Sequence, residues 1–211
     1  MYQLSYFPNN QNVNGVQAYD KEVDALNQHT KADKVYIVCS KEQLDENGSM
    51  KIFSMIDKLS AELSVASDNE TKKRLLMRRA IAHSVLRDFE AAISDFTYYI
   101  SLDDKNSLAY WQRAVCQAEM DEFNKAEGKG VLNIHSAEAD FSDAIRQNSN
   151  NAYIYYNRGN LHAGRNELSK AIDDYTIALR IDNLLAEAYY NRGIARAKSG
   201  NKQTAIQDLS K

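Results

Sequence analysis

The phrase YYNRG occurs twice in the chain, at Tyr155–Gly159 and at Tyr189–Gly193, and the two copies begin 34 residues apart. The same interval pairs further residues, among them Ala171 with Ala205. A related phrase, YWQRA, begins at Tyr110, which lies 45 residues before the first copy, so 11 residues are added to the interval there. A fixed period of this length is typical of a fold in which one structural unit is repeated in tandem.

The period divides residues 73–211 into units that cover 73–106, 107–151 with the 11-residue insertion, 152–185 and 186–211, of which the last is incomplete. In each unit, two apolar stripes with helical spacing flank a short polar turn. A small residue follows four positions after a bulky residue in the first stripe of every unit: Ala80, Ala114, Gly159 and Gly193. Each unit is therefore predicted to form two closely packed helices joined by a turn.

The additional residues of the second unit fall between Gln117 and Ala137. Eleven residues make about three helical turns, so a longer helix would keep its faces aligned. Gly128 and Gly130 instead favour a loop that follows a lengthened first helix, and this is the arrangement that we predict. We expect a surface insertion around residues 124–135; the alternative is that it covers part of a binding face, since loops often carry function.

This pattern of bulky, small and aromatic residues with a 34-residue period resembles the tetratricopeptide repeat family over Lys73–Lys211. The proline usual near the end of such a repeat is absent, and Asp104 and Asn183 stand in its place. The resemblance implies an all-α fold, a right-handed α-solenoid of helix-turn-helix hairpins. It also implies a protein without catalytic activity that acts through binding.

Residues 1–72 lie before the repeats and are predicted to form an extension and a capping segment, mainly helical. An amphipathic helix is expected over about residues 50–64, with Ile52, Phe53, Ile56, Leu59 and Leu63 on one face. Such a helix would cover the first apolar face of the array. The β-branched run Val35–Cys39 predicts a short strand or extended segment, and Val23–Lys31 a further short helix.

Composition excludes several classes of function. The net charge of −3 and the pI near 5.8 give no support for a nucleic-acid partner, which would favour a basic face. No run of apolar residues is long enough to span a membrane, and the first residues lack the basic-then-apolar order of a signal peptide, which leaves the compartment open. Cys39 and Cys116 are too few for a disulfide framework.

No arrangement of residues predicts a catalytic, cofactor or metal site. The four histidines show no ligand spacing with one another or with the cysteines: His29, His83, His135 and His162. His83 and His162 occupy the same repeat position, on the buried side of the first helix, and are predicted to be packing residues. No order of serine, histidine and aspartate, and no glycine-rich nucleotide motif, is present. We therefore expect no enzyme and no cofactor.

An arginine precedes the small residue of every unit, and an aspartate precedes the aromatic or leucine residue of every second helix. The arginines are Arg79, Arg113, Arg158 and Arg192, and the aspartates are Asp95, Asp140, Asp174 and Asp208. Their separations are 16, 27, 16 and 16 residues, and 27 is 16 plus the insertion of 11. We predict a partly buried, fork-shaped ion pair in each unit that sets the register of the hairpin. The alternative is that both are independent surface charges.

The resemblance also implies that the first helices of successive units line a concave groove that binds an extended peptide or a partner helix. The side chains predicted to face this groove are Met77, Ile81, Leu108, Trp111, Gln112, Val115, Tyr153, Tyr156, Asn157, Tyr190, Asn191 and Ile194. Large rings give apolar area, and amides can bond a peptide backbone. The alternative is that the rings only pack on the neighbouring first helix.

The sequence therefore predicts a non-catalytic scaffold that binds a protein or peptide of unknown identity. A second reading is a structural module that packs against another domain of a longer polypeptide or self-associates. The incomplete last hairpin, which exposes Ala205 and Leu209, is where self-association is expected.

Overall fold

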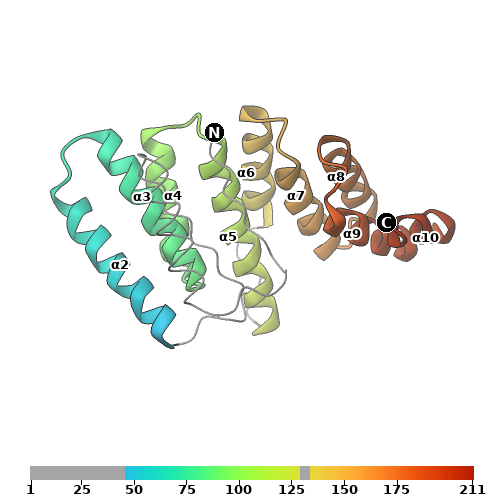
Figure 1. The fold of residues 1–211 in the computed structure, drawn as a ribbon, viewed down its shortest axis with the longest axis horizontal. Helices are drawn as coiled ribbons and strands as arrows, with labels where there is room; N and C mark the ends of the chain where they lie inside the picture. Colours follow the sequence, from blue (N-terminus) through green and yellow to red (C-terminus); the bar gives the residue numbers. More distant parts are fainter. Residues whose placement is uncertain (1–45, 129–133) are drawn as a thin grey trace. The chain divides into compact units, whose positions relative to one another are not determined.

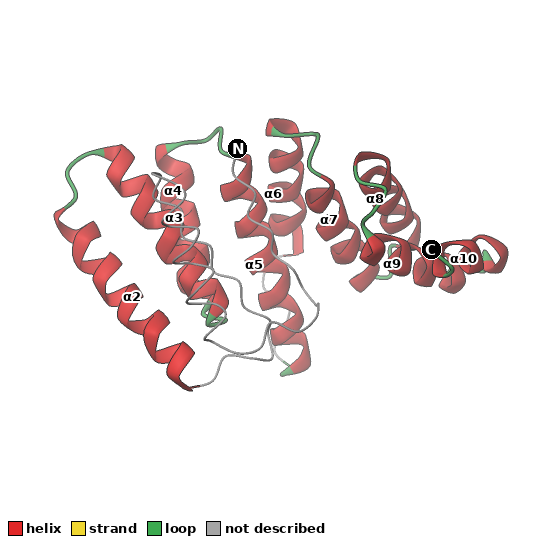
Figure 2. Cartoon of the chain, viewed as in Figure 1, coloured by secondary structure: helices red, strands yellow, loops and turns green. Residues whose placement is uncertain are grey.

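The computed structural model describes residues 46–128 and 134–211 (Figure 1). Every regular element in these two ranges is an α-helix, as Figure 2 shows, so the all-α prediction is confirmed. The helices are α2 (Glu46–Val65), α3 (Asn69–Val85), α4 (Phe89–Leu102), α5 (Ser107–Ala126), α6 (Ile134–Gln147), α7 (Ala152–Gly164), α8 (Leu168–Ile181), α9 (Ala186–Lys198) and α10 (Lys202–Leu209). The segments Val35–Cys39 and Val23–Lys31, with their predicted strand and helix, lie outside the described residues.

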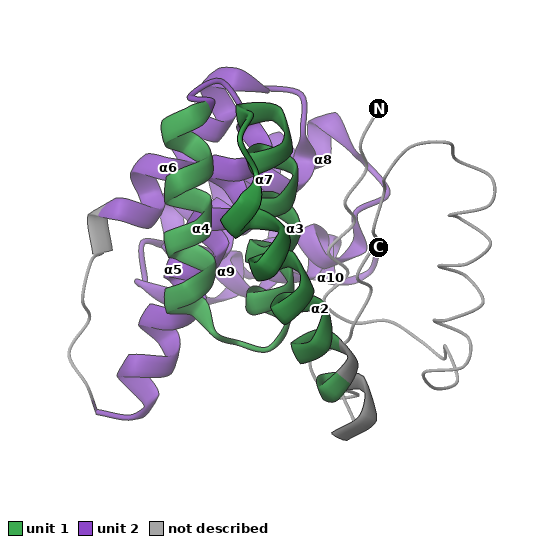
Figure 3. Cartoon of the chain, turned by 90° about the vertical axis from the view of Figure 1, so that its left-hand side faces the viewer, with its two compact units in different colours: residues 1–102 green, residues 103–211 purple. Residues whose placement is uncertain are grey.

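The chain divides into two compact units, Met1–Leu102 and Asp103–Lys211 (Figure 3). In unit 1, α3 packs against both α2 and α4. In unit 2, the hairpins are α5–α6, α7–α8 and α9–α10, and each second helix also contacts the first helix of the next hairpin. The boundary between the compact units thus lies one hairpin after residue 72, where the extension was predicted to end; that earlier boundary stays a prediction.

Side-chain oxygens cap the first turns of several helices. The Asp68 carboxylate accepts a hydrogen bond from the backbone N–H of Thr71 at 2.8 Å, at the start of α3. Asn106 and Asn151 do the same for the N–H groups of residues 109 and 153, each at 3.0 Å, at the starts of α5 and α7. Each cap satisfies a backbone donor that has no partner within the helix, which explains why polar residues separate the repeats.

The turn inside each hairpin contains a residue with a left-handed backbone. Arg87 and Asn166 have φ of 62° and 60°, and Gly200 has φ of 87°. These three residues occupy the same repeat position, since 87 plus 79 is 166 and 166 plus 34 is 200. A positive φ is uncommon for arginine or asparagine. The fold therefore requires this conformation at the end of the first helix whichever residue stands there.

The insertion lengthens the first helix of the second repeat. By register, Gly164 at the end of α7 corresponds to residue 119, because 164 minus 45 is 119, yet α5 continues to Ala126. The left-handed residue of this turn, Gly128, is likewise seven positions later than the register gives, since 166 minus 45 is 121. Seven of the 11 inserted residues thus form two additional turns of α5. Residues 129–133, where the predicted loop falls, lie outside the described residues.

The small residue of each first helix is a point of close helix contact. Ala80 and Ala114 have no exposed surface. At the same position in the α7–α8 hairpin, Gly159 lies under the ring of Tyr175, and Leu209 covers Gly193 in the last hairpin. The four small residues therefore mark where the two helices of a hairpin approach most closely.

Helix α2 buries a narrower face than its sequence suggests. Ile52, Ile56 and Leu59 are buried, and the first two pack against Ala82 of α3. Phe53, predicted to share this face, is 53% exposed, so its assignment to the buried face is wrong. Because α2 packs along α3, the buried stripe follows positions i, i+4 and i+7, and residue 53 falls outside it.

Candidate binding face of the first helices

In unit 2 the first helices α5, α7 and α9 lie side by side, because α7 contacts both of the others. We call the surface that these three helices share the first-helix face. Two hollows open on it, one between α5 and α7 and one between α7 and α9. The side chains around these hollows are the candidate binding residues.

The predicted groove residues differ strongly in exposure. Trp111, Gln112 and Tyr156 are buried, Tyr190 is 61% exposed, and the others are half-buried: Met77, Ile81, Leu108, Val115, Tyr153, Asn157, Asn191 and Ile194. Met77 and Ile81 belong to α3 in unit 1, apart from the first-helix face of unit 2. Val115 and Asn157 line the larger hollow, whereas Asn191 and Ile194 line the smaller one.

Two of the predicted rings pack on neighbouring first helices. The rings of Trp111 on α5 and Tyr153 on α7 stack with their centroids 6.5 Å apart and their planes at 25°. The hydroxyl oxygen of Tyr156 accepts a hydrogen bond from Nδ2 of Asn191 at 3.2 Å. Burial raises the pKa of Tyr156 above its ordinary value, so this hydroxyl stays protonated. These side chains connect adjacent hairpins, which is the packing role that the sequence left as an alternative.

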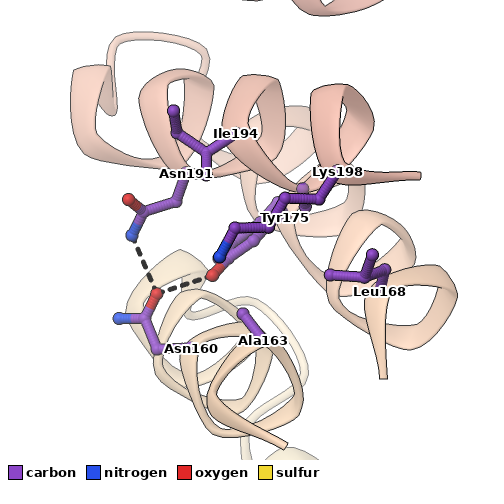
Figure 4. Close-up of a pocket in the computed structure, with 8 residues that line it drawn as sticks. Asn160, Ala163, Leu168, Tyr175, Asn191, Ile194 and Lys198 are labelled. Atoms are coloured by element: carbon purple, nitrogen blue, oxygen red, sulfur yellow. Dashed lines mark hydrogen bonds between the residues drawn. The ribbon is translucent and has the colours of Figure 1, made fainter. Parts of the chain in front are cut away.

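The smaller hollow, about 150 Å³, lies between α7 and α9 with a hydrogen-bonded cluster on its wall. Asn160 Oδ1 accepts from the Tyr175 hydroxyl at 2.8 Å and from Asn191 Nδ2 at 2.9 Å. Figure 4 shows these two bonds and the Asn160 nitrogen pointing away from both partners. The aliphatic side chains of Leu168 and Ile194 complete the wall. An amide group at the edge of an apolar hollow suits a ligand that itself carries amides.

The larger hollow, about 510 Å³, lies between α5 and α7. Its apolar lining includes Val115, Phe141 and Leu161, and Asn157 and Asn160 contribute carboxamides. Its volume falls within the range of roughly 300–1,000 Å³ that is usual for ligand pockets. Asn160 lines both hollows and therefore stands at the centre of the first-helix face.

The sequence prediction did not include Asn160, although the signal was present. Asn160 occupies the same repeat position as Ile81, Val115 and Ile194, all of which were predicted to face the groove, because 115 plus 45 is 160 and 160 plus 34 is 194. The acidic residues that α5 carries beyond residue 119 were missed for a different reason. They belong to the insertion, which has no counterpart in the other repeats.

Each hairpin contains an arginine–aspartate pair of the same geometry. In the α7–α8 hairpin, Arg158 donates from Nε and Nη2 to the two carboxylate oxygens of Asp174, at 2.8 and 2.7 Å. The equivalent pairs have donor–acceptor distances between 2.6 and 2.8 Å: Arg79 with Asp95, Arg113 with Asp140 and Arg192 with Asp208. The four aspartates are at most 5% exposed. Two parallel charge-assisted bonds fix the relative position of the two helices.

The guanidinium groups have additional partners. Hydrogen bonding to the aspartate is the largest cause that raises the pKa of Arg79, Arg113 and Arg158. The third arm of the guanidinium reaches the preceding helix: Arg79 Nη1 donates to Ser60 on α2 at 3.0 Å, and Arg192 Nη1 to Thr176 on α8 at 3.1 Å. The arginines therefore connect each hairpin to the helix before it.

A polar cluster lies at the turn end of α7. His162, 3% exposed, is bonded through Nδ1 to Oε2 of Glu167 at 2.7 Å. Lys170 Nζ lies 3.0 Å from the same carboxylate oxygen, and bonds from Lys170 and His162 lower the pKa of Glu167. Arg165 donates to Glu138 at 2.9 Å. His83 makes the equivalent contact with Asp88 at 3.0 Å, so both histidines serve hairpin turns.

Within residues 46–128 and 134–211, no group of three or more histidine, cysteine, aspartate or glutamate side chains is arranged to hold a metal ion. None of the helices in the same ranges combines the length and the apolar character that crossing a membrane requires.

Comparisons with known proteins identify the repeat. A sequence profile described as "Tetratricopeptide repeat" matches residues 132–185. No curated protein matches the chain by sequence.

Solved structures with similar folds include MamA, with a TM-score of 0.65, 20% identity and coverage of 79% of this chain and 92% of that one. The OM64 TPR domain from Arabidopsis has a TM-score of 0.54 and 19% identity, covering 62% of this chain and 98% of its own. YrrB, described as a TPR protein with an unusual peptide-binding site, has a TM-score of 0.56 and 16% identity, with coverage of 78% and 80%. At these identities the likeness establishes the fold, a solenoid of helical hairpins.

Proposed function

The chain is a tetratricopeptide repeat protein, and from this premise we propose that it is a non-catalytic scaffold that binds a peptide or partner protein on its first-helix face. The observation that carries the proposal is the pair of hollows between successive first helices, with the carboxamide of Asn160 on the wall of both. A peptide that runs across α5, α7 and α9 would pass both hollows in turn.

The chemistry of the face suits an extended peptide. A carboxamide can donate and accept at once, as a peptide unit does, and Asn157, Asn160 and Asn191 line the two hollows. Val115, Leu161 and Ile194 provide apolar area beside these amides. Backbone contacts would give affinity without strict sequence preference, and the hollows would select side chains. YrrB, with a similar fold, is described as having a peptide-binding site.

The test is selection of binders from a phage-displayed library of random decapeptides, with the chain immobilised. Peptides that are selected are then measured against a double variant, Asn157→Ala with Ile194→Ala. Both residues are half-buried on first helices, and one lines each hollow. If these positions contact the peptide, the dissociation constant should rise by about tenfold, which corresponds to roughly 1.4 kcal/mol.

The matched control is Ser169→Ala with Asp173→Ala, two exposed positions on the second helix α8. This variant should bind as the parent does. Circular dichroism and the urea midpoint establish that all three proteins are folded. Failure to select any peptide, or equal affinity of the parent and of the first-helix variant, would remove the proposal.

A second candidate function is assembly through the α9–α10 hairpin. Several large apolar side chains of this hairpin and the turn before it are exposed: Leu184 at 85%, Tyr190 at 61%, Ile206 at 64% and Leu209 at 47%. Apolar side chains gathered in this way favour contact with another domain or with a second copy of the chain.

Sedimentation equilibrium over a range of concentrations tests the second candidate. Self-association should be seen for the parent and be weakened by Ile206→Lys, which places a charge on the exposed side of α10. Phe53→Lys, at an exposed position on α2, is the control and should leave association unchanged. A monomer at all concentrations would restrict this candidate to contacts with another polypeptide.

A further inference from the structure

The hollow between α5 and α7 has a wall that the rest of the array lacks. Asp121, Glu122 and Lys125, which line it, all lie on the two additional turns of α5. The first helices α7 and α9 have 13 residues each against 20 in α5, so the smaller hollow has no equivalent wall. The insertion therefore gives one hollow a chemistry of its own.

This wall makes the hollow acidic. Its lining contains four carboxylates, from Glu119, Asp121, Glu122 and Glu167, against two cations, Lys125 and Arg165, an excess of two negative charges. The cation Arg165 donates to Glu138, a carboxylate outside the lining, at 2.9 Å. Hydrogen bonds from Lys170 and His162 hold the pKa of Glu167 below its ordinary value, so this group stays ionised at neutral pH.

One carboxylate reaches across the hollow. Oε1 of Glu122 on α5 lies 3.3 Å from the place where a Cβ atom of Gly164 would stand at the end of α7. The carboxylate thus lies against the opposite helix, where Gly164 leaves space for it. Its negative charge is therefore close to any side chain that enters between the two helices.

The apolar part of the lining suits the stem of a long side chain. Phe141 is 1% exposed and forms part of the hollow's surface together with Leu161 and Val115. Lysine and arginine place methylene groups along apolar surface while the charged end bonds to acceptors. The carboxylates and the oxygens of Asn157 and Asn160 are such acceptors. A glutamate or a chain-terminal carboxylate would instead meet a surplus of like charge.

We propose that the hollow between α5 and α7 is a subsite for a cationic side chain, lysine or arginine, of the bound peptide. This proposal rests on the proposed function, because it assigns a preference to one part of the same face. It makes the lengthened α5 the element that gives this array its selectivity.

The experiment uses five pools of fluorescein-labelled, N-acetylated decapeptide amides. The fifth residue is fixed in each pool as Lys, Arg, norleucine, Gln or Glu, and the other positions are random. The Lys and Arg pools should bind about three- to tenfold more tightly than the norleucine and Gln pools, as expected for partly exposed charge pairs, and the Glu pool should bind most weakly. The preference should decrease as the salt concentration rises.

The double variant Glu119→Gln with Glu122→Gln should lose the preference for the cationic pools while keeping its affinity for the norleucine pool. The control, Glu90→Gln with Asp173→Asn, changes two exposed acids on second helices and should keep the preference.

A direct probe of the subsite is N-acetyl-arginine methylamide. In an NMR titration it should shift the amide signals of Glu122, Leu161 and Gly164, whereas N-acetyl-glutamate methylamide should not.

Each outcome decides one of the two proposals. Equal binding of all five pools would leave the scaffold function standing and overturn the cationic subsite. A preference that survives in the Glu119→Gln, Glu122→Gln variant would also overturn the subsite, because the selecting charges would lie elsewhere. Absence of binding by every pool would count against peptide binding itself, and the subsite would be lost with it.

Discussion

The ring of Tyr175 covers Gly159 so closely that a Cβ atom at residue 159 would lie 2.7 Å from the Cε1 atom of the ring. Two more ring atoms would lie at 2.9 and 3.2 Å. Tyr175 is 1% exposed and its hydroxyl donates to Asn160, so the ring cannot move away without breaking that bond. The absence of a side chain at residue 159 is therefore what allows α7 and α8 to pack at this distance.

Gly159→Ala should accordingly destabilise the chain. The overpacking cost is of order 1–3 kcal/mol and exceeds the gain of just under 1 kcal/mol in helix propensity. The net loss of about 1–2 kcal/mol is measured by urea unfolding. Gly164→Ala is the control, because only the end of the Glu122 side chain comes within 4 Å of a Cβ there. Combining Gly159→Ala with Tyr175→Leu should cost less than the sum of the two single changes, and full additivity would contradict the contact.

Loss of an arginine from an ion pair should be costly because its aspartate is buried. Arg158→Met leaves Asp174, 4% exposed, without its bidentate partner, and the expected destabilisation is about 2–3 kcal/mol. The double change with Asp174→Asn should recover part of this loss, since no buried charge then remains unpaired. Arg180→Met, at an exposed position on α8, serves as control and should change stability by less than about 0.5 kcal/mol.

The repeat period explains why these ion pairs could be located from the sequence. Once the 34-residue register is known, arginine and aspartate recur at fixed positions on two helices that must pack together, and the insertion shifts one separation by its own length. The bonds among Tyr156, Asn160 and Asn191 could not be located in this way. They join helices of different hairpins, and their geometry depends on how closely α7 and α9 approach.

Exposure was the property that the sequence predicted least well. Periodicity assigns a residue to a face but does not give the width of the buried stripe, which is why Phe53 lies outside it. Trp111 and Tyr156 illustrate the reverse case, since both stand at groove positions and yet are buried by neighbouring first helices. The acidic wall of α5 depends on residues that interrupt the repeat, for which the repeat pattern supplies no position.

The Glu167 carboxylate should make stability depend on pH in the acid range. Its pKa is lowered from 4.5 in the folded state by Lys170 first and His162 second. The stabilisation is therefore present above about pH 4.5 and is lost as the pH falls through the folded-state pKa. Glu167→Gln should flatten the plot of unfolding free energy against pH below this value, whereas Glu62→Gln, at an exposed site on α2, should not. Identical pH profiles for parent and Glu167→Gln would contradict the assignment.

The thiol of Cys116 should be inert in the folded protein. It is 1% exposed, and burial raises its pKa to about 12, so the reactive thiolate is almost absent at neutral pH. In a Cys39→Ser background, reaction with Ellman's reagent should proceed only as fast as the region around α5 unfolds, and denaturant should make it immediate. Rapid labelling of the native protein at pH 7 would show that α5 opens far more readily than its packing suggests.

The third guanidinium arm has a consequence for how the array comes apart. Arg192 holds Asp208 within its own hairpin and Thr176 of the hairpin before it, and Arg79 joins Asp95 to Ser60 of α2 in the same manner. A hairpin that loses its internal pair thus also weakens its bond to its neighbour. Nearest-neighbour coupling of this kind favours cooperative melting over independent fraying of single repeats, with α2 melting together with the hairpin that it covers.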